Sequence, residues 1–194
     1  MRKTKEETIF TINRLMDVAK RHFTEKGYAN VALEDIVKEA ELTRGAVYHH
    51  FTNKKGLFLA VFEEIQKEVG IYVEKEAIKS DDMWEQLIHG CRAFLNAASK
   101  LENKRILLID GPAVLGWDTF RMMDQKYSMN SLYEQLMIMQ EHGLITSPSI
   151  ETLTHILSGA MNESVLWITD QPNRDQAIEA VMNVLKTMLS GIKK

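Results

Sequence analysis

The spacing of its apolar residues constrains the fold of this chain most strongly. Between residues 58 and 72 they recur at alternating steps of four and three, as Phe58, Phe62, Ile65, Val69 and Tyr72. This is the spacing of a helix that is packed along its whole length. The 194 residues include only three prolines and ten glycines, the residues that most often interrupt helices. The sequence therefore predicts an all-α fold, and we expect no strands.

Start and stop residues divide the helical pattern into segments. Expected N-terminal caps are Thr4 (with Glu7), Thr43, Asn53, Ser80 and Asn173. The stretch DGPAVLG at residues 110–116 breaks the spacing and predicts an interrupted or kinked helix. The predicted helices cover about residues 5–26, 33–40, 44–51, 54–78, 81–101, 128–142, 150–168 and 174–192.

Composition excludes several classes of protein. The hydrophobic fraction of 45% and the charged fraction of 26% are typical of a globular protein that is soluble in water. No apolar run approaches the roughly 18 residues that a membrane span needs. The charged N-terminal residues lead directly into a predicted helix, so we expect no signal peptide. With Cys91 as the single cysteine, a disulfide framework and a multi-cysteine zinc site are excluded. We expect a cytoplasmic protein without a cofactor.

Charge is distributed unevenly along the chain. Residues 1–60 contain 11 Lys and Arg against 8 Asp and Glu, a net charge of +3. Residues 61–194 contain 13 against 19, a net charge of −6, and the two parts sum to the −3 of the whole chain. This asymmetry indicates an N-terminal part that approaches a polyanion, although solvated helix faces alone could produce a split of this size.

The two short predicted helices near the N-terminus are separated only by Glu41-Leu42-Thr43, which is the spacing of a helix-turn-helix. The second of them presents Arg44, Tyr48 and His49 outward. Val47 and Phe51 face inward. A short polar helix of this kind can lie in the major groove of DNA.

The neighbouring residues fit the same interpretation. Gly45 and Ala46 have almost no side chain, so the backbone could approach a duplex closely. Lys54 and Lys55 stand at the start of the next helix, where side-chain charge and free N–H groups favour a phosphate.

These residues stand in a recognisable order over about residues 5–60. Gly27-Tyr28, Glu34-Asp35-Ile36, Ala40, Thr43, Gly45, Tyr48, His50-Phe51, Lys54 and Leu57 resemble the N-terminal domain of the TetR family of bacterial transcription regulators. The sequence departs from the family pattern at two places. Glu41 occupies a turn position that is often glycine, and the apolar Val31-Ala32 replaces a polar residue at the start of the second helix.

The resemblance implies the roles of individual residues. Tyr48 corresponds to a phosphate-contacting tyrosine and Lys54 to a lysine that contacts the DNA backbone. Arg44 is our candidate for a guanine contact, and His50 either contacts a phosphate or caps its helix. The predicted DNA-binding residues are Thr43, Arg44, Gly45, Ala46, Tyr48, His49, His50, Lys54 and Lys55.

Other chemistry fits this segment poorly. His49 and His50 are adjacent, so on a helix they point about 100° apart, whereas helical zinc pairs need a spacing of four residues. No nucleophile–base or paired-carboxylate motif supports a helical enzyme, so we expect no enzymatic activity. A peripheral membrane protein would need a strongly basic amphipathic helix, and the first helix mixes both charge signs.

The second half is rich in methionine and aromatic residues, which suit an adaptable apolar cavity. An ordinary helical core would explain any one of these residues, and Cys91 is most simply a small core residue rather than a redox sensor. Taken as a region, they predict a cavity for a small effector, as the resemblance also implies. The candidate lining residues are Trp84, Cys91, Phe94, Trp117, Phe120, Met123, Tyr127 and Met137.

The last two predicted helices carry apolar stripes broad enough to bury one face internally and another against a second copy. A homodimer, which the resemblance also implies, would place two DNA-reading helices about 34 Å apart on a near-palindromic operator.

The domain border falls at the long fourth helix, and we assign residues 1–53 to DNA binding and 54–194 to effector binding and dimerisation. The predicted function is a DNA-binding regulator, with double-stranded DNA, a second copy and a small apolar effector as partners. We favour a repressor that the effector releases, and a constitutively bound or architectural DNA-binding protein is the alternative.

Overall fold

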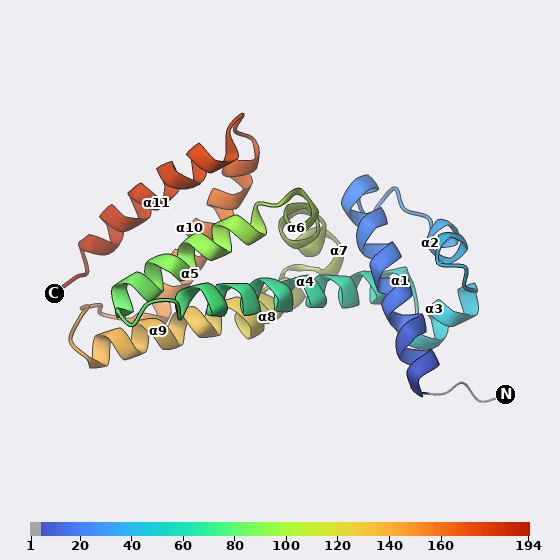
Figure 1. Ribbon diagram of the computed structural model, residues 1–194, viewed down its shortest axis with the longest axis horizontal. Coiled ribbons are helices and arrows are strands. Elements are labelled where there is room, and N and C mark those ends of the chain that lie inside the picture. Colours follow the sequence, from blue (N-terminus) through green and yellow to red (C-terminus); the bar gives the residue numbers. More distant parts are fainter. Residues whose placement is uncertain (1–4) are drawn as a thin grey trace. The chain divides into compact units, whose positions relative to one another are not determined.

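The computed structural model describes residues 5–194, and every regular element longer than an isolated bridge in this range is a helix (Figure 1). The predicted all-α fold is confirmed. The predicted cap at Thr4 lies outside the described residues. By contacts between Cα atoms, the chain divides into two compact units. The first contains residues up to 65 together with 101–120, and the second contains 66–100 and 121–194.

The first unit is built around the N-terminal helices. Its aromatic core joins Phe23, Tyr28 and Phe58, with ring centroids 5.1–5.8 Å apart. Its elements are α1 (Lys5–Lys26), α2 (Leu33–Glu39), α3 (Arg44–Phe51), the first half of α4 (Lys54–Ala77), α6 (Leu101–Lys104), the π-helical segment η1 (Arg105–Asp110), α7 (Gly111–Leu115) and the start of α8 (Trp117–Asp124).

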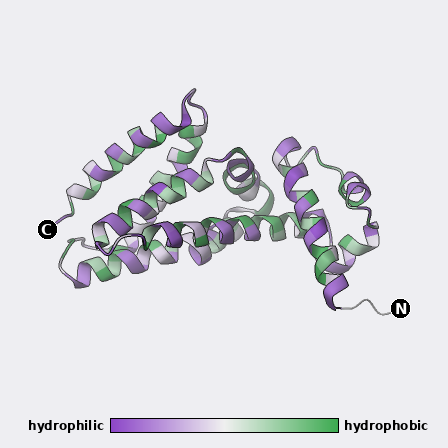
Figure 2. Ribbon diagram, viewed as in Figure 1, coloured by the Kyte–Doolittle hydropathy of each residue, from purple (hydrophilic) through white to green (hydrophobic). Residues whose placement is uncertain are grey.

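The second unit packs five longer segments side by side. Helices α5 and α10 each contact both α9 and α11, so they form the centre of this bundle. Its helices carry alternating hydrophobic and hydrophilic stripes, as the sequence spacing predicts (Figure 2). The elements are the second half of α4, α5 (Met83–Ala98), the end of α8, the π-helical segment η2 (Gln125–Met129), α9 (Asn130–Glu141), α10 (Ile150–Thr169) and α11 (Arg174–Ser190).

Two of the predicted caps form and two do not. The Asn53 Oδ1 accepts a hydrogen bond from the Gly56 N–H (2.9 Å), and the Asn173 Oδ1 accepts one from the Gln176 N–H (3.0 Å). Thr43 occupies the N-cap position of α3 without a capping bond from its side chain. The prediction for Ser80 is wrong, because α5 begins later and Asp82 caps it by accepting from the Glu85 N–H (2.9 Å).

The predicted interruption near residues 110–116 is confirmed. The chain passes from η1 into the short α7 and stops at Gly116, whose φ of 89° ends the helix. Gly111 lies at the junction, where a Cβ atom would stand 2.6 Å from the Phe62 ring and 2.9 Å from the Ile106 carbonyl oxygen. Only glycine allows this close approach within the first unit.

Candidate DNA-binding surface and candidate ligand cavity

The turn between α2 and α3 forms with a glutamate at its tightest position. Glu41 has a φ of 55°, in the left-handed region that glycine adopts most easily. The Glu41 carboxylate pairs with Arg14 of α1 at 2.8 Å. The Leu42 N–H then donates to the Val37 carbonyl (2.8 Å), which closes α2 before α3 begins. Glutamate therefore supports the turn in place of glycine.

Helix α3 is anchored by one fully buried side chain, Val47, and Phe51, the other residue predicted to face inward, is half-buried. Arg44, Gly45, Tyr48 and His49 are exposed. As the sequence predicts, the outer face of this helix is polar and its narrow inner face is apolar. The remaining predicted contacts are an exposed Thr43 and half-buried Ala46 and His50.

The Arg44 guanidinium has partners that the sequence spacing did not reveal. Its Nη1 lies 2.8 Å from a carboxylate oxygen of Glu34 on α2, and its Nη2 donates to the Tyr48 hydroxyl at 3.4 Å. These contacts hold the guanidinium at the surface of α3. Binding to a base would exchange the Glu34 contact for one with DNA.

The two lysines at the start of α4 differ in their surroundings. The Lys54 ammonium lies 4.2 Å from the centroid of the Tyr28 ring, where burial lowers its pKa and the negative charge of Asp110 partly opposes that shift. Lys55 is exposed. Lys54 thus has a structural contact in addition to its predicted role, whereas Lys55 is free to approach a phosphate.

Segment η1 holds the turn that follows α1. The Arg105 Nη1 donates to the carbonyl oxygens of Thr24 (3.0 Å) and Glu25 (2.9 Å), which have no helical partner at the end of α1. The Asp110 carboxylate accepts from the Tyr28 N–H at 2.8 Å. Sequence analysis missed both residues, because nothing in the local pattern places residues 105–110 beside α1.

A cavity of about 180 Å³ lies in the second unit between α4, α5, η2, α9 and α10. Of the eight predicted lining residues, Cys91, Phe94 and Tyr127 line it. Phe120 and Met123 are buried, whereas Trp117 is exposed. Apolar spacing cannot distinguish a cavity wall from an ordinary core position, so the prediction mixed the two. The predicted residues that do not line this cavity are Trp84, Trp117, Phe120, Met123 and Met137.

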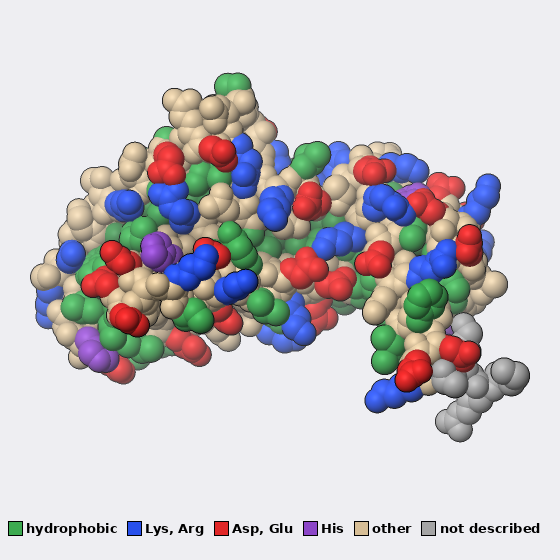
Figure 3. All heavy atoms as spheres, viewed as in Figure 1, with side chains coloured by type: hydrophobic (Ala, Val, Ile, Leu, Met, Phe, Trp, Pro, Cys, Tyr) green, Lys and Arg blue, Asp and Glu red, His purple; other side chains and the backbone are tan. Residues whose placement is uncertain are grey.

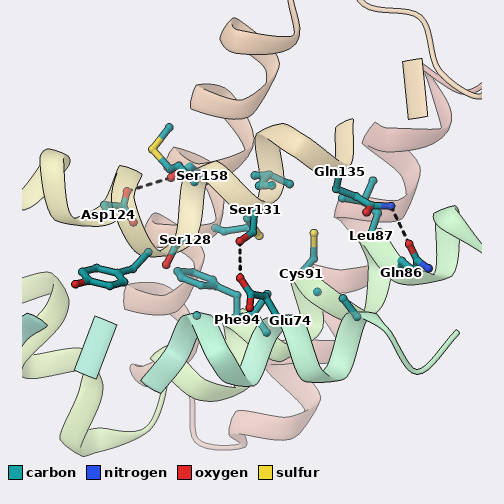
Figure 4. Close-up of a pocket in the computed structure, with 18 of the residues that line it drawn as sticks. Glu74, Gln86, Leu87, Cys91, Phe94, Asp124, Ser128, Ser131, Gln135 and Ser158 are labelled. Carbon is teal, nitrogen blue, oxygen red and sulfur yellow. Dashed lines mark hydrogen bonds between the residues drawn. The ribbon is translucent and has the colours of Figure 1, made fainter. Parts of the chain in front are cut away.

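The polar groups of the cavity were missed by sequence analysis. Ser131 donates to the Glu74 carboxylate at 2.9 Å, Gln135 donates to the Gln86 side-chain oxygen at 3.3 Å, and Ser158 donates to Asp124 at 3.4 Å (Figure 4). The Ser128 hydroxyl oxygen is buried and has no hydrogen-bond partner. None of the described residues that line the cavity is Lys, Arg or His.

Two ionisable groups in the cavity have shifted pKa values. Burial raises the pKa of the Asp124 carboxyl, although Arg121 at 2.9 Å and the Ser158 hydroxyl favour its charged form. Burial raises the pKa of the Cys91 thiol to about 12, so this thiol is protonated at neutral pH. A reactive thiolate needs a depressed pKa, and Cys91 therefore belongs to the cavity wall rather than to a redox centre.

Residues 5–194 include no cluster of three or more His, Cys, Asp or Glu side chains that could hold a metal ion. No helix within residues 5–194 is both long enough and apolar enough to cross a membrane.

Together, α2 and α3 form a helix-turn-helix with a polar outer helix and a basic helix start beside it, which is the arrangement of a DNA-binding protein. Residues 15–61 match the family model "Bacterial regulatory proteins, tetR family". Residues 84–192 match the model "Tetracyclin repressor-like, C-terminal domain", which alone covers more than half of the chain. The chain belongs to the TetR family of bacterial transcription regulators.

Individual relatives agree with this assignment. The chain is 35% identical over 112 residues to the HTH-type transcriptional regulator AcrR of Shigella flexneri, a match over 55% of this chain and half the length of AcrR. It is 26% identical over 152 residues to the Tn10 TetC protein of Escherichia coli, covering 77% of this chain and 75% of TetC.

Solved structures extend the likeness to the whole chain. A TetR-family regulator from Pectobacterium atrosepticum superposes with a TM-score of 0.80 at 30% identity over 98% of both chains. The complex of RolR with resorcinol superposes with a TM-score of 0.69 over 93% of this chain and 90% of RolR. At 19% identity this second likeness shows the fold alone.

Proposed function

We propose that this protein is a homodimeric, cytoplasmic repressor that binds a near-palindromic operator and releases it when a small, largely apolar effector occupies the cavity. The observation that carries the proposal is the outer face of α3. It is short, polar and exposed, it is fixed by the buried Val47, and it lies beside the basic start of α4.

Base reading is assigned to Arg44. Its guanidinium is exposed at the surface of α3, where Glu34 and Tyr48 hold it, and its planar fork matches the two acceptors on the edge of guanine. A bidentate contact with guanine contributes about 1–3 kcal/mol of discrimination. Lys55, Lys54 and Tyr48 supply contacts to phosphates that position the helix without reading sequence.

Effector control is assigned to the cavity. Helix α4 carries Lys54 at its first turn and Gly70, Val73 and Glu74 at the cavity, so one continuous helix belongs to both functional regions. RolR, a protein of the same fold, binds resorcinol. The alternative is a DNA-binding protein that has no effector, and the cavity disfavours it.

The first test measures DNA binding. An operator selected from random DNA is titrated with the wild type, Arg44→Ala and Lys55→Ala by fluorescence anisotropy, with Lys100→Ala in the second unit as the charge-matched control. Arg44→Ala should lower the preference for the operator over random DNA by about 5- to 150-fold, from the loss of one base contact.

Lys55→Ala should weaken binding to all sequences and reduce the slope of log K against log salt by about one unit. It is preferred to Lys54→Ala because the Lys54 ammonium also packs on Tyr28. If Arg44→Ala kept the full preference for the operator, the assignment of base reading would be refuted.

A further inference from the structure

We infer that the cavity takes a compound with a single six-membered ring that donates hydrogen bonds and carries no negative charge. This inference rests on the proposed function in that it treats the cavity as the effector site. The argument uses the size of the cavity, its apolar wall and the kind of polar groups that reach it.

Size sets the first limit. An apolar cavity of about 150 Å³ holds one benzene molecule. The cavity here measures about 180 Å³, which leaves room for one ring and a substituent of one or two atoms. Two fused rings would exceed this volume.

The apolar side chains that line the cavity would pack against the ring. Leu87, Cys91 and Phe94 line the cavity from α5, and Met161 lines it from α10. Cys91 and Leu87 are each 3% exposed. Ring burial against such side chains provides the bulk of the binding free energy, and the flexible Met161 can adjust to the ring.

The polar groups set the charge and the hydrogen-bonding character. Two carboxylates, of Glu74 and Asp124, line the cavity without a cationic lining residue (Figure 4). Each already accepts one serine hydroxyl, from Ser131 and Ser158, and Asp124 is also paired with Arg121. A carboxylate has about four acceptor sites, so both can accept from a ligand as well. An anionic ligand would face the carboxylates of Glu74 and Asp124, of which only Asp124 is paired with a cation, and is disfavoured.

Ser128 is the lining residue whose hydrogen bonding a ligand would complete. Its hydroxyl oxygen is buried at the cavity and has no partner, which is an unfavourable state for a polar group. Ser128 belongs to η2, and single π-helical turns inside α-helical runs frequently occur at functional sites. A hydroxyl or amino group on the ligand would pair with Ser128 and also donate to a carboxylate.

The test compares four compounds that share one ring and a one-carbon arm, titrated into the full chain without DNA by isothermal calorimetry. Benzyl alcohol carries a neutral donor, benzylamine carries a cationic donor because it is protonated at neutral pH, toluene carries no donor, and benzoate is an anion. We expect benzyl alcohol to bind about 3- to 10-fold more tightly than toluene, which is the range for one hydrogen bond, and benzylamine to bind at least as tightly as benzyl alcohol because it also attracts the carboxylates. Benzoate should bind at least about 10-fold more weakly than benzyl alcohol.

Variants locate the binding. Ser128→Ala should remove most of the advantage of benzyl alcohol over toluene, whereas Ser164→Ala, which removes a hydroxyl on α10 that donates to the Ala160 carbonyl, should leave it unchanged. Cys91→Leu fills the cavity and should abolish the binding of all four compounds. The inference is overturned if benzoate binds as tightly as benzyl alcohol, if toluene equals the donors, if 1-naphthalenemethanol binds more tightly than benzyl alcohol, or if none of the compounds binds.

A separate titration distinguishes this inference from the proposed function. Benzyl alcohol is added to the protein–operator complex, and release is followed by anisotropy. Release supports both claims. Calorimetric binding without release contradicts effector control by such compounds and leaves the ligand class supported. Specific operator binding with no calorimetric binding contradicts the ligand class alone.

Discussion

Asp124 is 3% exposed at the edge of the cavity, a costly position for a negative charge. Arg121 Nη1 lies 2.9 Å from its carboxylate and Ser158 donates to it, yet burial outweighs both and raises its pKa above the ordinary value of 3.8. Because the raised pKa belongs to the folded state, the folded protein holds this proton more tightly than the unfolded chain does. Asp124 therefore stabilises the fold below its unfolded pKa, and this contribution is lost as the pH rises through the folded pKa.

Asp124→Asn should remove that pH dependence. Asparagine cannot ionise, so the variant should become more stable relative to the wild type as the pH rises from about 3 to about 7: its free energy of unfolding minus that of the wild type should increase. Urea unfolding of both proteins at several pH values measures the difference, and other titrating groups cancel in the comparison. If this difference in the free energy of unfolding stayed constant or decreased with rising pH, the effect assigned to the burial of this carboxyl would be contradicted.

At the scale of elements, the cavity depends on how closely α4 approaches η2. Gly70 of α4 faces the Tyr127 carbonyl oxygen, and a Cβ atom at Gly70 would stand only 2.4 Å from it. The close atom is a backbone carbonyl oxygen and not the end of a flexible side chain, so it cannot move away without a shift of the helix backbone. The same approach positions Tyr127 and Ser128 at the cavity.

Gly70→Ala should therefore destabilise the protein, although alanine is the better helix former. Overpacking costs about 1–3 kcal/mol, against a gain in helix propensity of about 0.5–1 kcal/mol. The matched control is Gly90→Ala in α5, where a Cβ atom would make ordinary contacts of 3.8 Å with Ala77 and Val73.

Gly90→Ala should stabilise by about 0.5–1 kcal/mol, because its gain in helix propensity meets no clash. Thermal and urea unfolding report both values. If the two substitutions changed the free energy of unfolding equally, the close approach of α4 to η2 would not be what makes Gly70 necessary.

At the scale of the whole molecule, α10 and α11 present apolar side chains that the single chain leaves uncovered. Ile156 and Trp167 of α10 are 56% and 47% exposed, and Val184 and Met188 of α11 are 60% and 51% exposed. Residues 156 and 167 are three helical turns apart, and residues 184 and 188 are one turn apart, so each pair shares a helix face. Elsewhere, basic and acidic side chains are intermingled on the face drawn in Figure 3. The apolar faces of α10 and α11 are where we expect a second copy to bind.

Val184→Glu combined with Met188→Glu should convert the proposed dimer into a monomer. Two carboxylates at an apolar interface would remain unpaired when buried, which is strongly unfavourable. Sedimentation velocity measures the mass, and circular dichroism verifies that the helices remain. The monomer should also lose operator affinity, since one half-site supplies fewer contacts. Lys100→Glu, at an exposed residue outside α10 and α11, changes the net charge by the same amount and is the charge control. A variant that stayed dimeric would place the interface elsewhere.

Much of the fold and part of the candidate site could be predicted from the sequence. Helical spacing gave α1, α3 and α4 to within a residue at either end, because a helix is stabilised by neighbours three and four positions away. The outward set on α3 followed from the same periodicity around Val47. The roles assigned to those residues in DNA binding stay predictions, as does the domain border at residue 53.

Whether a feature was determined by the sequence alone or by the tertiary structure depends on how far apart in the chain its interacting residues lie. Local spacing by itself determined the helices, the helix-turn-helix and the order of motif residues that marks the family, because these depend on residues close together in the chain. Only the tertiary structure placed Glu34 against Arg44, Arg105 and Asp110 against the end of α1, and Glu74, Asp124 and Ser128 around one cavity. The direct contacts join residues 10 to 82 positions apart in the chain, and Glu74 precedes the other two cavity residues by 50 or more positions. Which of many possible distant partners meet is decided by the packing of whole helices, and no local pattern encodes it.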